Sequence, residues 1–379
     1  MLTAAETGQF ESFRPKRFAQ RYGLDPFLTL MLFVTSVFGL VVLYSASGQS
    51  EYMVIRQAAH LIAGFCLMAL LSQIRREVIM QLTPLVFVFA LLLLVAVLLF
   101  GVGAKGAQRW LDLPGLPRFQ PSELMKLALP AMVAWWLTRH PLPPQHSHFM
   151  IAAVMLVIPV GLIAKQPDLG TSIIIAGSGF FVIFLAGLSW RILGLLSAAG
   201  LAALPILWSV MRDYQKARVL TLLDPQSDPL GAGWNTIQAM TALGSGGLLG
   251  KGYAEGTQAQ LKFLPESHTD FIVAVIGEEL GFLGICLLLL MYGLILGRCL
   301  LLTSRAESHF GRLLCGSITL TFFVYVFVNL GMVSGVLPVV GVPLPLISYG
   351  GTSVVSLLIG FGLIMAMQRT NRVLSGDSS

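Results

Sequence analysis

Charged side chains interrupt otherwise apolar sequence at three places, and the first of these combines an acid with a base. Glu123 and Lys126 follow Pro121, a residue suited to the first turn of a helix. Since they are three residues apart, they share one helical face and can form an ion pair. An ionisable side chain within a bilayer is costly unless it is paired or faces a wet cavity. Two interpretations therefore stay open: a structural pair that fixes helix packing, or a pair that lines a polar cavity and orients a substrate.

The second place is Asp168, which stands between two apolar segments and just before Gly170 and Thr171. An aspartate at such a position can cap the following helix and interact favourably with its dipole. Taken alone, this feature favours capping. The alternative is that Asp168 forms a polar wall of a cavity.

The third place is the polar stretch 211–269 and its exit into an apolar segment. Its glycines at 244–252 suggest a phosphate-binding loop, but that motif fails. Ser245 stands where the first glycine is required, and neither Ser nor Thr follows Lys251. These glycines are better explained as tight turns near the membrane surface.

Asp270 closes this stretch and lies two residues after His268. We expect it at the water–lipid boundary, where a carboxylate partly removed from water holds a proton more tightly. Such a group suits general-base catalysis. The alternative is that Thr269 or Asp270 caps the helix that follows.

The elements that must position these residues are membrane helices. Of 379 residues, 56% are hydrophobic and only 11% are charged, and the mean hydropathy is +0.81. Soluble domains carry about a quarter charged residues, so this chain could not cover a water-facing surface. Because backbone groups in lipid must satisfy one another, the long apolar runs must be helices. The sequence predicts an all-α, polytopic integral membrane protein with about ten transmembrane helices.

We expect one transmembrane domain over residues 1–379, with 1–26 as a cytoplasmic leader before a retained first helix. The long extracytoplasmic loop is 211–269, between the seventh and eighth spans. Most Lys and Arg residues of the short loops fall on the side of the N-terminus, which predicts that both termini are cytoplasmic. The ten spans are predicted at 27–46, 54–72, 81–101, 122–139, 148–164, 170–187, 191–210, 270–297, 312–335 and 350–368.

Composition also limits the partners and the metal chemistry. The net charge of +6 reflects this topology and indicates no nucleic-acid partner. The four cysteines lie in or beside apolar spans without CxxC spacing, so we interpret them as small core residues. The sequence requires no cofactor and leaves a divalent cation, held by outer carboxylates, undecided.

Several segments resemble, in this order, the SEDS family (shape, elongation, division and sporulation proteins) of membrane glycosyltransferases. The resemblance covers essentially the whole chain. Two further stretches, 337–345 and 256–258, are similar to the RodA branch, which serves side-wall elongation. The segments that carry the family resemblance are FQPSE at 119–123 with Lys126, QPDLGT at 166–171, LPESHTDF at 264–271 and GVPLPLISYGGTS at 341–353.

This resemblance implies polymerisation of lipid II into glycan strands, by inverting transfer that expels undecaprenyl pyrophosphate. A pyrophosphate leaving group needs no general acid, so one base that takes the proton of the acceptor hydroxyl suffices, and Asp270 is the candidate catalytic residue for that role. Glu123, Lys126 and Asp168 would organise the cavity. Cations must offset the departing phosphates, and the candidates on the outer side are Lys105, Arg109, Arg118 and Arg218. Candidate substrate contacts are Trp234, Asn235, His268 and Ser348.

Alternatives remain for some of these assignments and for the function. Trp234 and Asn235 could only anchor the loop at the interface, and Ser348 could only serve a tight turn. The resemblance also implies a class B penicillin-binding protein as transpeptidase partner, within an elongation complex in the bacterial inner membrane. A lipid II flippase or other transporter, and a non-catalytic scaffold of that complex, are the alternative functions. An inverted repeat, often found in transporters, is not evident in the sequence.

Overall fold

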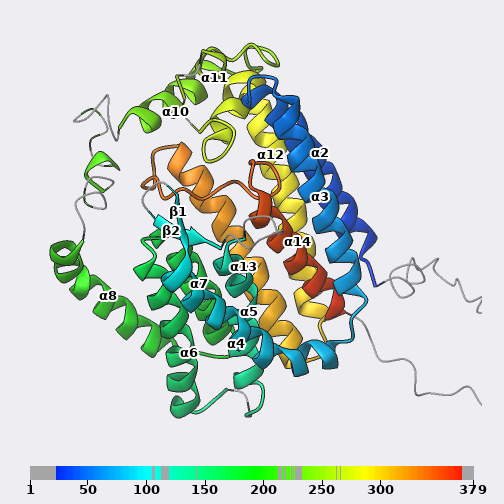
Figure 1. Ribbon diagram of the computed structural model, residues 1–379, viewed down its shortest axis with the longest axis vertical. Helices are drawn as coiled ribbons and strands as arrows, with labels where there is room; N and C mark the ends of the chain where they lie inside the picture. The colour runs from blue at the N-terminus through cyan, green and yellow to red at the C-terminus, as the bar shows by residue number, and fades with distance from the viewer. Residues whose placement is uncertain are drawn as a thin grey trace, which may run out of the picture.

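The computed structural model describes residues 23–104, 107–111, 119–141, 143–211, 216, 219–222, 224, 226, 233–261, 263–264 and 266–368. These residues form a helical bundle (Figure 1). The first six of the helices that correspond to predicted spans are α2 (Pro26–Ala46), α3 (Glu51–Ser72), α4 (Arg76–Phe100), α5 (Pro121–Leu137), α6 (His146–Lys165) and α7 (Leu169–Leu185). The other four are α8 (Trp190–Val210), α12 (Ile272–Arg305), α13 (His309–Val333) and α14 (Gly351–Ala366).

Each predicted span coincides with one of these helices, so the prediction of an all-α polytopic membrane protein is confirmed. Within the described residues, six helices are long and apolar enough to cross a bilayer: α2, α3, α4, α6, α12 and α13. Apolar helices of 10–17 residues lie in α7, α8 and α14. Large apolar side chains such as Leu85, Phe100 and Leu195 are exposed on the bundle, as expected for a surface that faces lipid.

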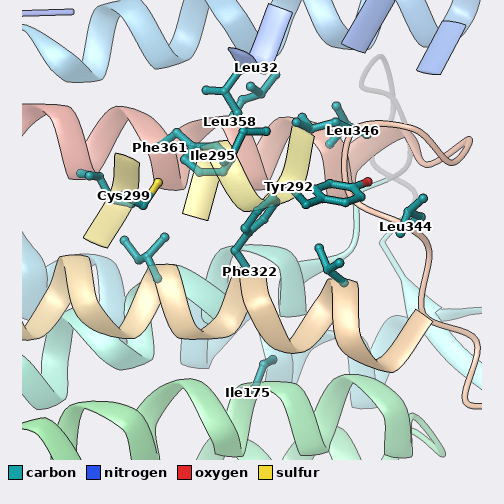
Figure 2. Close-up of a cluster of buried hydrophobic side chains, with 14 of the residues drawn as sticks. Leu32, Ile175, Tyr292, Ile295, Cys299, Phe322, Leu344, Leu346, Leu358 and Phe361 are labelled. Carbon is teal, nitrogen blue, oxygen red and sulfur yellow. The ribbon is translucent and has the colours of Figure 1, made fainter. Parts of the chain in front are cut away.

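Helix α13 lies at the centre of the bundle. In its most apolar window 67% of the residues are buried, against 17% for α6, so α13 is surrounded by protein while α6 faces outward. It packs against α12, α7, α5 and α14. A cluster around Tyr292 and Phe322 joins α12, α13 and α14 (Figure 2). The ring centroids of these two residues are 5.8 Å apart, and the Tyr292 hydroxyl donates to the Pro345 carbonyl at 2.6 Å.

The most extensive helix pairing joins α3 to α14. Glycine allows it, because a Cβ at Gly362 would lie 2.8 Å from the Met68 carbonyl oxygen. Small residues at such contacts let backbones approach closely in a membrane, where van der Waals packing drives helix association. Helix α8 differs, since it lies at the edge of the bundle (Figure 1) and most of its side chains are exposed.

Helix α12 was predicted as one span, and the structure divides it at Gly281. This residue has φ 64° and ψ −158°, which is not helical. A Cβ there would collide with the backbone nitrogen of Gly250, so only glycine fits between α12 and the segment 246–258. The break lets backbone N–H groups of that segment reach α12: Lys251 donates to the Glu278 carbonyl at 3.0 Å and Gly252 to that of Glu279 at 3.1 Å.

Connections outside the spans also contain regular structure. Strands β1 (Val102–Ala104) and β2 (Ala107–Trp110) form an antiparallel hairpin between α4 and α5. The stretch predicted as a long loop contains α10 (Trp234–Ser245) and α11 (Thr257–Gln260). Helix α10 packs on α12 and α13, so this part of the stretch is packed against the bundle.

Two of the four cysteines do not fit their predicted role as core residues. Cys299 and Cys315 are buried, whereas Cys66 and Cys286 are exposed on the apolar surface. All four are free thiols. The reason is that lipid is as apolar as the core, so the hydrophobic effect does not drive a small thiol to the inside of the bundle.

Candidate active site

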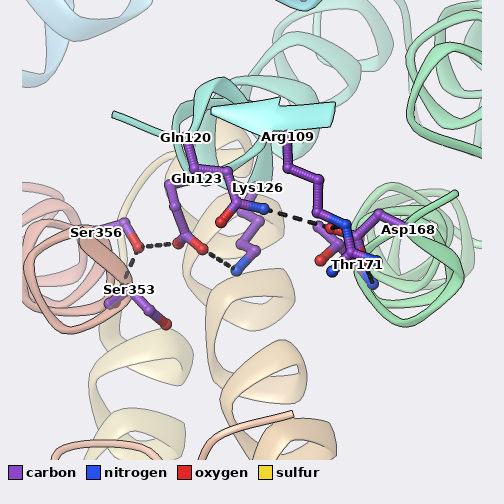
Figure 3. Close-up of polar contacts among 8 residues, drawn as sticks. All are labelled: Arg109, Gln120, Glu123, Lys126, Asp168, Thr171, Ser353 and Ser356. Carbon is purple, nitrogen blue, oxygen red and sulfur yellow. Dashed lines mark hydrogen bonds and ion pairs between the residues drawn. The ribbon is translucent and has the colours of Figure 1, made fainter. Parts of the chain in front are cut away.

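The predicted ion pair between Glu123 and Lys126 is present near the start of α5. The Lys126 ammonium lies 2.7 Å from the Glu123 carboxylate, and the Ser356 hydroxyl of α14 donates to the other carboxylate oxygen at 2.6 Å (Figure 3). The ammonium also lies 5.1 Å from the ring centroid of Tyr325 on α13. Pro121 occupies the first turn as expected, and the N-cap is Gln120. The pair therefore joins three helices.

Asp168 performs both of the roles considered for it. It is the N-cap of α7, where its carboxylate accepts from the Thr171 backbone N–H at 3.3 Å. Its other oxygen accepts from the Gln120 amide at 3.3 Å and lies 3.5 Å from the Arg109 guanidinium (Figure 3). Arg109, on β2, also donates to the Pro167 carbonyl at 2.8 Å. Asp168 therefore caps α7 and also links it to the hairpin and to α5.

These two acid–base pairs line one cavity of about 190 Å³. Its walls come from β2, α5, α7 and α13, together with the segment 341–343 and the first turn of α14. Arg109 and Lys126 contribute two positive charges and Glu123 and Asp168 two negative ones, so the charges of these four side chains balance. The cavity can hold a polar group that neither lipid nor the packed core would accept.

Asp270 lies beside the wall of this cavity. Neither Thr269 nor Asp270 caps α12, because the N-cap is Phe271 and no side chain bonds there. A Cβ at Gly341, a residue of the cavity wall with φ +74°, would be 3.5 Å from the Asp270 carboxylate. Helix capping, the alternative considered for Asp270, does not explain its position.

The side chain of Asn329 on α13 bonds to the backbone of both segments, the one that carries Asp270 and the one that carries Gly341. Its amide nitrogen donates to the Asp270 carbonyl at 3.0 Å and to the Val342 carbonyl at 2.7 Å. The side chain is fully buried and its amide oxygen has no hydrogen-bond partner among the described residues. A single amide thus ties the segment of Asp270 to the cavity wall. The prediction missed this residue, although one amide inside an apolar span is the signal that could have identified it.

Ser348 and His268 connect the segment before α14 to the segment before Asp270. The Ser348 hydroxyl donates to the Thr269 carbonyl and accepts from the Leu344 N–H. The Tyr349 N–H donates to the His268 carbonyl at 2.9 Å, and the two rings lie edge to face. Since Ser348 is buried and its hydroxyl is used by the backbone, its observed contacts position this turn.

The remaining predicted site residues lie away from the cavity or outside the described residues. Trp234 and Asn235 begin α10, where the Trp234 indole donates to the Phe263 carbonyl at 2.8 Å. Neither belongs to the cavity wall. Of the predicted phosphate-binding cations, Arg109 lines the cavity. Lys105, Arg118 and Arg218 lie outside the described residues.

Glu278 and Glu279, on the first part of α12, form a separate polar cluster. The Glu278 carboxylate is fully buried and accepts from the Lys251 ammonium at 2.7 Å, the Thr257 hydroxyl at 2.9 Å and the Gln258 N–H at 3.1 Å. Glu279 accepts from the Ser45 hydroxyl on α2. Glu278 therefore attaches the segment 246–258 to α12, and Glu279 attaches α12 to α2. Among the described residues, His, Cys, Asp and Glu do not gather in a group of three or more that could hold a metal ion.

Comparison with known proteins finds one family over nearly the whole chain. The family model FTSW_RODA_SPOVE, described as "Cell cycle protein", matches residues 26–373. The chain is 50% identical over 361 residues to peptidoglycan glycosyltransferase MrdB of Escherichia coli K12, which covers 95% of this chain and 97% of that protein. It is 35% identical over 367 residues to the probable peptidoglycan glycosyltransferase FtsW of Trichlorobacter lovleyi, covering 93% and 94%.

Solved structures agree with these sequence matches. One, described as the structural coordination of polymerization and crosslinking by a peptidoglycan synthase complex, is similar with a TM-score of 0.80 at 33% identity and covers 91% of this chain and 97% of that one. The crystal structure of the rod shape determining protein RodA of Thermus thermophilus is similar with a TM-score of 0.69 at 31% identity, covering 93% and 98%.

Proposed function

This chain belongs to the FtsW, RodA and SpoVE family of cell cycle proteins and is a peptidoglycan glycosyltransferase, and we propose that it polymerises lipid II during cell elongation. The observation that carries the mechanism is the polar cavity with the Asp270 carboxylate beside its wall. Both substrates of such a reaction carry polyprenyl chains in the bilayer and sugars outside it. A catalyst for them needs polar groups at a cavity within a membrane bundle.

In the proposed reaction the 4-hydroxyl of the acceptor sugar attacks the anomeric carbon of the donor. The new carbon–oxygen bond forms with inversion as the bond to the pyrophosphate oxygen breaks. The hydroxyl proton passes to the Asp270 carboxylate, and the electron pair of the broken bond leaves on undecaprenyl pyrophosphate. One base suffices, because pyrophosphate is a good leaving group without protonation.

The other side chains of the cavity organise it. Glu123 and Asp168 each hold a cation, Lys126 and Arg109, at a defined place in the cavity wall. Preorganised cations stabilise the charge that develops on a leaving group. We further assign Lys105, Arg118 and Arg218 as ligands of the phosphates, and Trp234, Asn235 and His268 as contacts to the substrate. Ser348, also considered as a substrate contact, instead positions the turn before α14.

We place this multi-pass protein in the bacterial inner membrane, with both termini in the cytoplasm and the cavity open toward the outer side. Its proposed partner is a class B penicillin-binding protein that crosslinks the strands within the elongation complex. The similarity to a chain from a peptidoglycan synthase complex supports this partnership.

The decisive experiment measures polymerisation of lipid II by the purified full chain with its transpeptidase partner. Asp270→Asn is compared with wild type and with a control, Glu255→Gln, which neutralises an exposed carboxylate on the segment 246–258. We expect polymer from wild type and Glu255→Gln and none from Asp270→Asn. Polymer from all three would move the base elsewhere. The absence of polymer from all three, where a control polymerase works, would favour a flippase or a scaffold.

A further inference from the structure

Helices α2 and α12 pack side by side (Figure 1), and contacts at their two ends show how they are aligned. The Arg298 guanidinium of α12 donates to the carboxylate of Asp25, the N-cap of α2, at 2.6 Å and 3.0 Å. Near the other end of α2, the Ser45 hydroxyl donates to the Glu279 carboxylate of α12. The two helices are therefore antiparallel, and Glu279 lies at the level of Ser45.

Helix α2 is as long as the hydrocarbon core of a bilayer is thick. Its 21 residues extend over about 30 Å, and the core of a typical bilayer is also about 30 Å thick. The levels of Asp25 and Ser45 therefore mark the two boundaries of the core. Polar residues follow directly after Ala46, as expected outside it. The second boundary meets α12 at Glu279.

A glycine-rich turn between α10 and α11, residues 246–253, crosses this second boundary. The backbone N–H groups of Phe282 and Leu283 donate to its carbonyls at Gly247 and Leu248, at 2.9 Å and 3.2 Å. These two donors are the third and fourth residues of α12 past the boundary, so the bonds lie about 5 Å inside it. The tip of the turn is therefore within the hydrocarbon core.

Tyr253 gives the same depth from the other helix. Its hydroxyl donates to the Val41 carbonyl of α2 at 2.8 Å. Val41 is four residues before Ser45, which places this bond about 6 Å inside the boundary. Because the Val41 side chain is exposed, Tyr253 lies against the lipid-facing side of α2. Tyrosine is common at this level of a bilayer, where one end of the side chain is in an apolar environment.

The backbone of the turn suits this depth because α12 satisfies it. In an unbroken helix the Glu278 carbonyl would accept from Phe282, and the carbonyl of Glu279 from the next residue. The break at Gly281 separates these partners. The turn supplies both: its carbonyls accept from the two N–H groups, and its N–H groups donate to the two carbonyls. Irregular backbone at membrane depth is tolerated only where protein satisfies it in this way.

The side chains at the tip of the turn are apolar and point away from the bundle. Leu248 is 72% exposed and Leu249 is 77% exposed. The neighbouring Phe282 and Leu283 of α12 are also exposed, and the exposed apolar face of this helix continues to Leu290. The two leucines thus extend a surface that already faces lipid. In water they would add to an exposed apolar patch of a kind that monomeric proteins avoid.

We propose that the turn 246–253 is a re-entrant membrane anchor, with Leu248 and Leu249 among the phospholipid acyl chains of the leaflet opposite the Asp25 end of α2. The stretch between α8 and α12, which the sequence predicts to lie outside the bilayer, is then held at its middle by lipid as well as by protein. The anchor goes beyond the proposed function and requires neither the reaction nor a particular orientation of the chain.

The test measures how deep a nitroxide spin label lies when the purified full chain is in phospholipid nanodiscs. The exposed Cys66 and Cys286 are replaced by alanine, and the buried Cys299 and Cys315 stay. A label is then attached to Leu249→Cys. Molecular oxygen is enriched in hydrocarbon and a water-soluble nickel chelate is excluded from it. The ratio of their collision rates with the label therefore reports contact with lipid or with water.

Two matched positions calibrate this ratio. Leu290→Cys places the label on the lipid-facing side of α12. Glu255→Cys replaces an exposed carboxylate of the segment 246–258, which must contact water because an unpaired charge is costly in lipid. We expect the ratio of oxygen to nickel collisions at position 249 to resemble that at 290 and to exceed that at 255 several-fold. A label on Leu248→Cys should give the same result.

Two results would overturn the anchor. A label at position 249 that collides with the nickel chelate as often as one at 255 would show that the turn lies in water. A label that neither reagent reaches, while position 290 stays accessible to oxygen, would show that protein covers the leucines. The cover would then be a second copy of the chain, since no other protein is present in the nanodiscs.

Discussion

The cavity and the cluster at Glu278 both bury carboxylates within a membrane bundle, yet they differ in what surrounds the charge. Glu278 is 0% exposed and its oxygens accept from a lysine, a hydroxyl and a backbone N–H. Glu123 is also buried, but its partner Lys126 lines a cavity of about 190 Å³. A buried acid with all its acceptors used holds elements together. A buried acid beside an open cavity can exchange a hydrogen-bond partner for a substrate.

The sharpest test of this difference is Asp270→Asn. We expect polymerisation to fall by roughly 10²–10⁴-fold, the range for loss of a general base, while thermal unfolding stays close to wild type because this side chain caps no helix. Parallel assays of polymer formation and of melting in detergent measure both. Near-normal turnover by Asp270→Asn would show that Asp270 is not the base and has a structural role like that of Glu278.

Glu278→Ala should lower the unfolding temperature more than it lowers polymerisation. Removing the carboxylate leaves the Lys251 ammonium without its ion-pair partner and the Thr257 hydroxyl without an acceptor. Each lost hydrogen bond to the charged carboxylate costs roughly 1.5–3 kcal/mol, so the unfolding temperature should drop substantially. The double variant Glu278→Leu with Lys251→Met, which removes both charges, should recover part of the loss. A single variant as stable as wild type would contradict the fastening role.

Lys126→Met should reduce activity more than stability. It leaves the Glu123 carboxylate with the Ser356 hydroxyl, but water in the cavity can solvate the acid. We expect polymerisation to fall at least tenfold, about 1.4 kcal/mol in transition-state stabilisation, with a smaller fall in melting temperature than for Glu278→Ala. Lys126→Arg, which keeps the charge, is the matched control. A collapse of the fold with Lys126→Met would favour the structural interpretation of the pair.

Asn329→Leu should have the smallest of these effects on the chemistry, since Asn329 acts through the backbone of Asp270. The variant removes the donor to two carbonyls, and each lost hydrogen bond costs about 1 kcal/mol. We expect kcat to fall several-fold with little change in KM for lipid II. Asn329→Gln, which keeps an amide, should restore part of kcat. A change confined to KM would mean that the residue shapes substrate binding instead.

The fold was largely predictable because lipid leaves the backbone few choices. Apolar runs long enough to cross a bilayer must be helices, and each predicted span coincides with one. The exceptions have local causes that hydropathy does not record. The break of α12 at Gly281 depends on the close approach of Gly250. The hairpin before α5 and the helix α10 lie where apolar periodicity is weak.

The sequence alone determined the class of protein, the pairing of Glu123 with Lys126 and the identities of the acids worth testing. Those features depend on composition and on neighbours within one helical turn. Only the tertiary structure decided that Ser356, 233 residues from Glu123, bonds to it, and that Asp270 faces Gly341 across the cavity wall. Helix packing brings distant positions together, and spacing along the chain carries no record of it.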